Sequence, residues 1–115
     1  MSRAEAGRRA EELAAAFLRA KGLTILERNF RAKVGEIDLV AREGEEVVFV
    51  EVRSRSSRDY GGAAASVDAG KRRRLVRAAR LWLVARGWEG ACRFDVVALD
   101  GGRLEHLPAA FTADG

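Results

Sequence analysis

Apolar residues recur every three or four positions in the first twenty residues, the spacing of a helix with one buried face. The pattern predicts a helix over residues 3–21 that ends at Gly22. Two neighbouring glutamates take different places on this helix. Glu12 lies nearly opposite the apolar face, whereas Glu11 lies at its edge and could lean toward a sheet. The apolar positions are Ala10, Leu13, Ala14, Phe17 and Leu18.

Three strands are predicted next, over residues 24–31, 35–42 and 46–53, with a tight turn at 43–45 between the last two. Side chains alternate between the two faces of a strand. Ile37 and Leu39 should therefore share one face, and Glu36 and Asp38 the other. In the next strand the alternation separates Val48, Val50 and Val52 from Phe49, Glu51 and Arg53. One face of this hairpin is aliphatic, and the other gathers carboxylates and a guanidinium.

The second half of the chain predicts a helix between strands. A polar loop over 54–67 leads to a helix over 69–87, with Asp68 as its N-cap. Strands follow at 93–99 and 103–107, joined by a turn at 100–102, and we expect the tail, 109–115, to fray. The apolar positions of this helix are Leu75, Ala78, Ala79, Trp82 and Ala85.

These elements fit one domain over residues 1–115. A helix between two strands favours a parallel, right-handed connection between them. The order of elements therefore predicts an α/β fold with a mixed central sheet flanked by helices.

Asp38 and Glu51 are the carboxylates whose proximity matters most. If they face each other on paired strands, their Cβ atoms lie about 5 Å apart. Two like charges at that distance repel by about 3 kcal/mol at an effective dielectric constant near 20. Arg53 offsets part of this repulsion, and a hard divalent cation such as Mg²⁺ would offset more. The alternative is a salt-bridged sheet surface that faces solvent.

The pattern of Asp38 followed by Glu51-Val52-Arg53 resembles the D…(D/E)-x-K core of the restriction-endonuclease-like, or PD-(D/E)xK, nucleases. A longer string makes the resemblance more specific. On this string the chain is identified as a member of the YraN-like family of small bacterial proteins, which is similar to archaeal Holliday-junction resolvases. The resemblance covers residues 7–107 and implies a restriction-endonuclease-like αβββαβ core. The string includes Gly35-Glu36-Ile37-Asp38-Leu39, Phe49-Val50-Glu51-Val52-Arg53 and Arg93-Phe94-Asp95-Val96-Val97.

The resemblance implies metal-assisted hydrolysis of phosphodiesters in DNA, including branched or junction DNA. Asp38 and Glu51 would hold Mg²⁺ or Mn²⁺, with the Val52 carbonyl as a third ligand and Glu11 as a direct or water-mediated one. Glu36 would orient a water molecule.

Two basic residues would stabilise charge on the phosphate oxygens, Lys71 and Arg53. Lys71 continues the apolar face of the second helix into its first turn, so we expect it to point toward the sheet. The alternative is that it extends past the helix end into solvent.

One position departs from the superfamily pattern, because the lysine position holds Arg53. A guanidinium stays protonated and cannot act as a general base, although it still supplies positive charge. Two functions therefore stay open: a nuclease, and a nucleic-acid-binding module that has kept the fold and lost the chemistry. A third, a protein-binding adaptor or a homodimer, rests on the additional apolar residues of the second helix, which are Leu81, Leu83 and Val84.

A net charge of +4, from 21 basic and 17 acidic residues, favours a polyanionic partner such as DNA. We expect Arg55 and Arg58 in the loop to contact phosphates and Tyr60 to stack on a base. Arg73 and Arg77 on the second helix are the other candidate phosphate contacts. A solvated loop and a solvated helix face are the alternatives.

The remaining chemistry-bearing residues are few. With one cysteine, the chain has no intramolecular disulfide and no cysteine-rich metal site, and we expect Cys92 to be buried. His106, the only histidine, is expected as a polar residue on an edge strand. No apolar run reaches transmembrane length and the N-terminus lacks the apolar core of a signal peptide, so we expect a cytoplasmic protein with no membrane partner.

Overall fold

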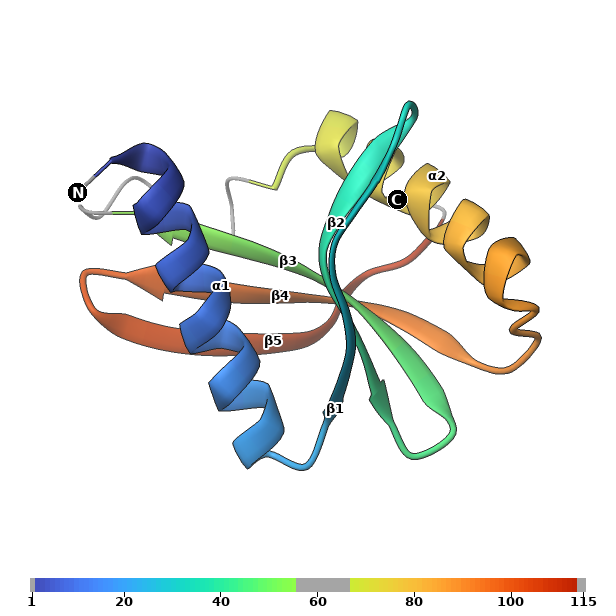
Figure 1. The fold of residues 1–115 in the computed structure, drawn as a ribbon, viewed down its shortest axis with the longest axis horizontal. Helices are drawn as coiled ribbons and strands as arrows, with labels where there is room; N and C mark the ends of the chain where they lie inside the picture. The colour runs from blue at the N-terminus through green and yellow to red at the C-terminus, as the bar shows by residue number, and fades with distance from the viewer. Residues whose placement is uncertain (1, 56–66, 114–115) are drawn as a thin grey trace.

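In the part of the chain that the structure describes, residues 2–55 and 67–113, one helix packs against each face of a five-stranded sheet (Figure 1). The structure is a computed structural model. It confirms the predicted α/β class and is compatible with an αβββαβ core. The helices are α1 (Arg3–Ala20) and α2 (Ala69–Arg86), and the strands are β1 (Thr24–Ala32), β2 (Gly35–Glu43), β3 (Glu46–Arg55), β4 (Cys92–Asp100) and β5 (Arg103–Phe111).

The strands lie in the sheet in the order of the sequence, from β1 to β5. Strands β3 and β4 are parallel, and the other neighbouring pairs are antiparallel. The parallel pair is the one connected through α2, as the crossover rule predicts. The predicted turns are confirmed as well, because β2 ends at Glu43 and β3 begins at Glu46, while β4 ends at Asp100 and β5 begins at Arg103.

Both helices begin and end where their capping residues require. The hydroxyl of Ser2 accepts a hydrogen bond from the Glu5 amide at 3.1 Å, and the carboxylate of Asp68 accepts one from the Lys71 amide at 2.9 Å. Helix α2 ends at Gly87, whose φ of 63° closes the last turn in a left-handed conformation. The Asp68 cap fixes the first turn of α2, and with it the position of Lys71.

Apolar side chains form a separate core on each side of the sheet. On the α2 side, Phe49 stacks on Phe94 with ring centroids 5.6 Å apart, and Phe94 stacks on Phe111 at 5.2 Å. On the α1 side, the fully buried Leu18 packs with residues of β2 and β3. The aromatic core lies under α2, so the β3 side chains on that face beyond Phe49 come next to the first turn of this helix.

The β1–β2 hairpin bends at Asn29, whose φ of 53° is left-handed. The register pairs Arg28 with Leu39 and Phe30 with Ile37, but Asn29 and Asp38 between them are not among its pairs. Ile37 therefore packs in the α2-side core and Leu39 in the α1-side core. The prediction that Ile37 and Leu39 share a face is wrong, because strict alternation does not hold across this bend.

Details of three other elements differ from the prediction. In α1, Ala15 is buried and Leu13 is 41% exposed, so the buried face is rotated toward Ala15. Ala85, near the end of α2, is exposed rather than buried. Strand β5 runs to Phe111, four residues past its predicted end, because the Phe111 ring stacks on Phe94. The expected fraying is therefore wrong for residues 109–111.

Neither α1 nor α2 combines the length and the apolar character that a membrane crossing requires, within the residues described.

Candidate functional site

The site begins where β2 and β3 cease to pair. Their register runs from Glu43–Glu46 at the turn to Leu39–Val50. Continued by one residue, it would place Asp38 opposite Glu51. Instead, the Val52 amide donates a hydrogen bond to Oδ2 of Asp38 at 2.8 Å. The Asp38 carboxylate thus takes the place of a backbone acceptor and is directed toward β3.

Burial raises the pKa of both carboxyl groups. Loss of hydration, together with the nearby Asp38 charge, raises the pKa of Glu51 from 4.5 to about 8, against the lowering effect of Arg53 and Lys71. Loss of hydration also raises the pKa of Asp38 from 3.8 to about 6, although its hydrogen bond from Val52 acts in the opposite direction. The two basic side chains therefore do not offset the cost of burying two carboxylates, and the site favours additional positive charge.

Arg53 and Lys71 both reach the same pocket as Glu51. Arg53 Nη1 lies 3.7 Å from Oε1 of Glu51. Lys71 belongs to the first turn of α2 and points toward the sheet, as predicted, because it lines a pocket of about 470 Å³ together with Glu51 and Arg53. Asp38 does not line this pocket, but its charge acts on Glu51. The charged lining residues are Arg31, Glu36, Glu51, Arg53, Lys71 and Arg74.

Gly35 sets the distance between the β1–β2 hairpin and α2. A Cβ atom at this position would lie 2.3 Å from the carbonyl oxygen of Arg74, so only a hydrogen fits there. The hairpin tip thus rests directly on the helix backbone, as the proximity of β2 and the N-terminal half of α2 in Figure 1 suggests. This contact holds the strand that bears Asp38 against the helix that bears Lys71.

Two further glutamates surround the carboxylate pair. Glu11 is half-buried on α1, and its charge contributes to the raised pKa of Asp38, so it leans toward the site as predicted. Glu36 lines the pocket but is largely exposed, and Arg31 Nε lies 3.7 Å from its carboxylate. Both residues are therefore near Asp38, and the Glu36 side chain is far more exposed than that of Glu51.

The carboxylate oxygens of Asp38 and Glu51 suit a hard divalent cation better than a metal ion that is fully enclosed by protein ligands. Among the described residues, no group of three or more His, Cys, Asp and Glu side chains is placed to hold a metal ion. Asp38 and Glu51 instead suit an ion that binds one or two carboxylates and completes its coordination with water and phosphate oxygens, as Mg²⁺ does. A direct bond from Glu11 is not favoured by this arrangement, whereas a water-mediated contact stays a prediction.

Comparison with known sequences assigns the chain to a family. The profile described as "Uncharacterised protein family UPF0102" matches residues 10–99. The chain belongs to the UPF0102 family. It is 54% identical over 108 residues to a UPF0102 protein of Dechloromonas aromatica, an alignment that covers 94% of this chain and 89% of the relative. It is 54% identical over 114 residues to one of Cupriavidus taiwanensis, covering 98% and 87% of the two chains.

The predicted nucleic-acid contacts of this UPF0102 chain either lie away from the pocket or fall outside the residues that the structure describes. Arg73 and Arg77 are exposed on α2 and do not line the pocket. The predictions for Arg58 and Tyr60, and for the side chain of Arg55, fall outside the described residues. Leu81 and Val84, which are 46% and 80% exposed, extend apolar character on the outside of α2 as expected.

The sequence analysis missed two basic residues of the candidate site, Arg31 and Arg74, and both line the pocket. The available signal was Gly35, since a glycine at the start of a strand can mark a close approach by another backbone. That approach brings Arg74 of α2 next to the hairpin that carries Arg31. The spacing of residues within β1 or within α2 could not have predicted that Arg31 and Arg74 line the same pocket.

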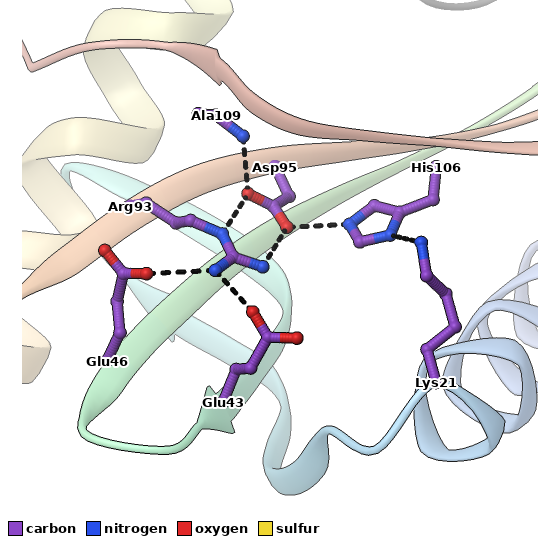
Figure 2. A network of polar contacts seen from close by, with 7 residues as sticks. All are labelled: Lys21, Glu43, Glu46, Arg93, Asp95, His106 and Ala109. Carbon is purple, nitrogen blue, oxygen red and sulfur yellow. Dashed lines mark hydrogen bonds and ion pairs between the residues drawn. The ribbon is translucent and has the colours of Figure 1, made fainter.

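A second polar cluster, shown in Figure 2, centres on the fully buried Asp95 of β4. The Arg93 guanidinium donates to both Asp95 oxygens, at 3.0 and 3.2 Å, and the Ala109 amide donates at 2.9 Å. His106 Nε2 lies 2.7 Å from Asp95 and Nδ1 lies 2.7 Å from Lys21 Nζ. Because Asp95 accepts and Lys21 donates, the ring proton belongs on Nε2.

This cluster joins five elements of the UPF0102 fold. Lys21 is the C-cap of α1, and Nη1 of Arg93 reaches Glu43 of β2 at 2.7 Å and Glu46 of β3 at 2.9 Å. His106 lies on the edge strand β5 as predicted, but its side chain is only 3% exposed, which the sequence analysis did not anticipate. Cys92, expected to be buried, is half-buried at the start of β4.

Proposed function

We propose that this protein is a cytoplasmic, metal-dependent endonuclease that hydrolyses phosphodiester bonds in DNA, with branched or junction DNA as the substrate class. One observation carries the proposal. Two partly buried carboxylates with raised pKa values, Asp38 and Glu51, lie together where two strands separate, and two basic side chains, Arg53 and Lys71, share the pocket of Glu51. Perturbed carboxyl groups in a polar pocket are typical of catalytic sites.

Asp38 and Glu51 are the proposed ligands of Mg²⁺ or Mn²⁺, with the Val52 carbonyl as a third. A divalent ion bound there supplies activation of a water molecule and neutralisation of phosphate charge. Burial keeps Glu51 protonated near neutral pH without a cation, so this carboxyl group must release a proton when it becomes a ligand. The proposed ion therefore binds more tightly as the pH rises toward 8.

The chain's own side chains orient and stabilise the substrate. The hydrogen bond from the Val52 amide holds Asp38 toward β3, so its carboxylate needs little rearrangement. Lys71 and Arg53 place positive charge beside Glu51, where they can oppose charge that develops on phosphate oxygens. Glu36, at the mouth of the pocket, is the proposed residue that orients a water molecule. Arg73 and Arg77 remain the proposed contacts to phosphates farther along the DNA.

A second function, a nucleic-acid-binding module without catalysis, is favoured by Arg53. Its guanidinium lies 3.7 Å from Glu51, in the position where the D…(D/E)-x-K pattern has lysine. Unlike a buried lysine, it cannot lose its proton to act as a base. If the chemistry requires only positive charge at this position, arginine is sufficient, and the nuclease proposal holds.

One cleavage experiment separates the two functions. Linear, flap and four-way-junction DNAs are incubated with Mn²⁺ and the wild-type, Glu51→Ala, Arg53→Lys or Arg53→Ala protein. We expect cleavage by the wild type, its loss in Glu51→Ala, partial retention in Arg53→Lys, and a decrease of about 10²- to 10³-fold in Arg53→Ala. If the wild type binds but cleaves none of the DNAs, the binding module is the correct function. Unchanged cleavage by Glu51→Ala would show that the site is elsewhere.

A further inference from the structure

A second hollow of about 430 Å³ lies between α1 and β1. Three guanidinium groups line it against one carboxylate, and the side chain of Leu13, 41% exposed, lies among them. Arg9 and Arg19 are separated by ten residues of α1, which corresponds to about 15 Å along the helix axis. We call this hollow the α1–β1 groove, and its lining residues are Arg9, Glu12, Leu13, Arg19 and Arg28.

Residues that line the α1–β1 groove are direct neighbours, in the chain or across the sheet, of residues at the carboxylate pair. Arg28 pairs with Leu39, the residue next to Asp38. Glu12 follows Glu11, whose charge acts on Asp38. Arg28 lines the α1–β1 groove, whereas Arg31, three residues farther along β1, lines the pocket beside α2. Basic side chains therefore flank the carboxylates on both sides of the hairpin.

The arginines of the groove are available for an external partner. Within residues 2–55 and 67–113, the side chains of Arg9, Arg19 and Arg28 form neither a hydrogen bond nor an ion pair, and Glu12 does not pair with them. Some other arginines are engaged within the protein, as Arg93 is with Asp95. Three such guanidinium groups against one carboxylate leave the hollow with a net positive charge, which attracts anions.

We propose that the α1–β1 groove binds the phosphodiester backbone of the same nucleic-acid strand whose scissile phosphate lies at Asp38 and Glu51. This inference rests on the proposed function, since it assigns a path to the substrate of that site. A small anion would occupy one basic hollow, whereas a polymer with regularly repeated charges fits two hollows with the carboxylates between them. Leu13 offers an apolar surface to a sugar or base between the phosphate contacts.

The proposed role of the groove is tested by measuring DNA binding under conditions that prevent metal-dependent cleavage. Affinity of the full chain for a 30-nucleotide DNA duplex is measured by fluorescence anisotropy in EDTA at several salt concentrations. Each lost phosphate contact should reduce the slope of log K against log salt by about 0.9. We expect this decrease in Arg9→Ala and in Arg28→Ala. Arg103→Ala is the matched control, because it removes one exposed arginine at β5, on the opposite edge of the sheet.

Four results would overturn the inference. Slopes that are unchanged in Arg9→Ala and Arg28→Ala would exclude phosphate contacts in the groove, and an equal decrease in Arg103→Ala would indicate general surface charge. If poly-glutamate loses affinity in these variants as much as DNA does, the groove accepts acidic polypeptides and is not specific for nucleic acid. If the wild type binds no DNA, both the inference and the proposed function fail. Decreased slopes together with no cleavage under Mn²⁺ would support the groove and refute the nuclease alone.

Discussion

At the scale of single residues, the candidate site is defined by the cost of burying charge. The side chain of Glu51 is 16% exposed and lies beside a second carboxylate, and the cations that face it do not restore an ordinary pKa. A carboxyl group with a strongly raised pKa in the native state lowers the free energy of unfolding at neutral pH, because the unfolded chain can ionise it at less cost. This loss of stability is consistent with selection for binding a ligand rather than for stability.

The raised pKa values of Asp38 and Glu51 should make the free energy of unfolding depend on pH. The native-state pKa values of Asp38 and Glu51, about 6 and about 8, exceed the values of 3.8 and 4.5 for the unfolded chain. Between about pH 4 and pH 8 the native state therefore binds more protons, and the free energy of unfolding falls as the pH rises. Glu51→Gln removes much of this effect, so its melting temperature relative to wild type should increase from pH 5 to pH 8 in EDTA.

Even a gain of about 1 kcal/mol at pH 8 would raise the melting temperature by about 4 °C in a domain of this size. Thermal unfolding at several pH values provides the measurement. Glu45→Gln, at an exposed position in the β2–β3 turn, is the matched control and should not change the pH dependence. A parallel pH dependence in wild type and Glu51→Gln would show that Glu51 does not have a raised pKa.

At the scale of elements, the site depends on a hairpin that bends and then rests on a helix. Asn29 of β1 has a left-handed φ of 53°, and Gly35 lets the hairpin tip contact the backbone of α2. Glu36 of β2 and Lys71 of α2 therefore line one pocket, and the charge of Asp38 acts on Glu51 in the same pocket.

The contact at Gly35 leads to a prediction for the element. In Gly35→Ala, the new methyl group would meet the Arg74 carbonyl at 2.3 Å, so the hairpin must move away from α2. We expect a loss of about 1–3 kcal/mol in stability, the usual cost of overpacking, and a weaker Mn²⁺-induced rise in melting temperature. Chemical denaturation measures the first effect and thermal unfolding with Mn²⁺ the second.

Gly7→Ala is the matched control for this substitution. Gly7 lies within α1, and a Cβ atom there would have no neighbour within 4 Å. Replacing a helical glycine by alanine stabilises by about 0.5–1 kcal/mol, so Gly7→Ala should become more stable. Unaltered stability and metal response in Gly35→Ala would mean that the hairpin tip does not depend on its contact with α2.

At the scale of the whole molecule, the Asp95 cluster connects α1 and strands β2 to β5 (Figure 2). Its centre is dry, since the Asp95 side chain is not exposed and that of Arg93 is 17% exposed. Ion pairs of this kind need not stabilise relative to apolar residues, but the removal of one partner leaves the others buried without compensation.

Asp95→Ala should therefore destabilise the protein by about 3–5 kcal/mol, because Arg93, His106 and the Ala109 amide all lose their acceptor. Removal of the partly exposed Glu43, whose side chain is 47% exposed, should cost less than about 1 kcal/mol. Denaturant unfolding of both variants provides the comparison. A loss below about 1 kcal/mol in Asp95→Ala would show that the cluster does not connect these elements energetically.

The α/β class, the order of elements and the parallel pairing of β3 with β4 could all be predicted from the sequence. These features depend on local periodicity, on capping residues such as Asp68, and on a connection rule, and each of them acts over short stretches of chain. The convergence of Asp38 with Glu51 was also predictable, because a tight turn determines the register of the strands that it joins.

Other features were decided only by the tertiary structure. Strict alternation fails in β2 between Ile37 and Leu39, so their faces could not be derived from strand periodicity. Arg31 and Arg74 enter the pocket, and Asp95, His106 and Lys21 meet, because residues far apart in the sequence are brought together by packing. The burial that raises the pKa of Glu51 has the same origin, since it depends on what every surrounding element excludes from water and not on the residue's own neighbours in the chain.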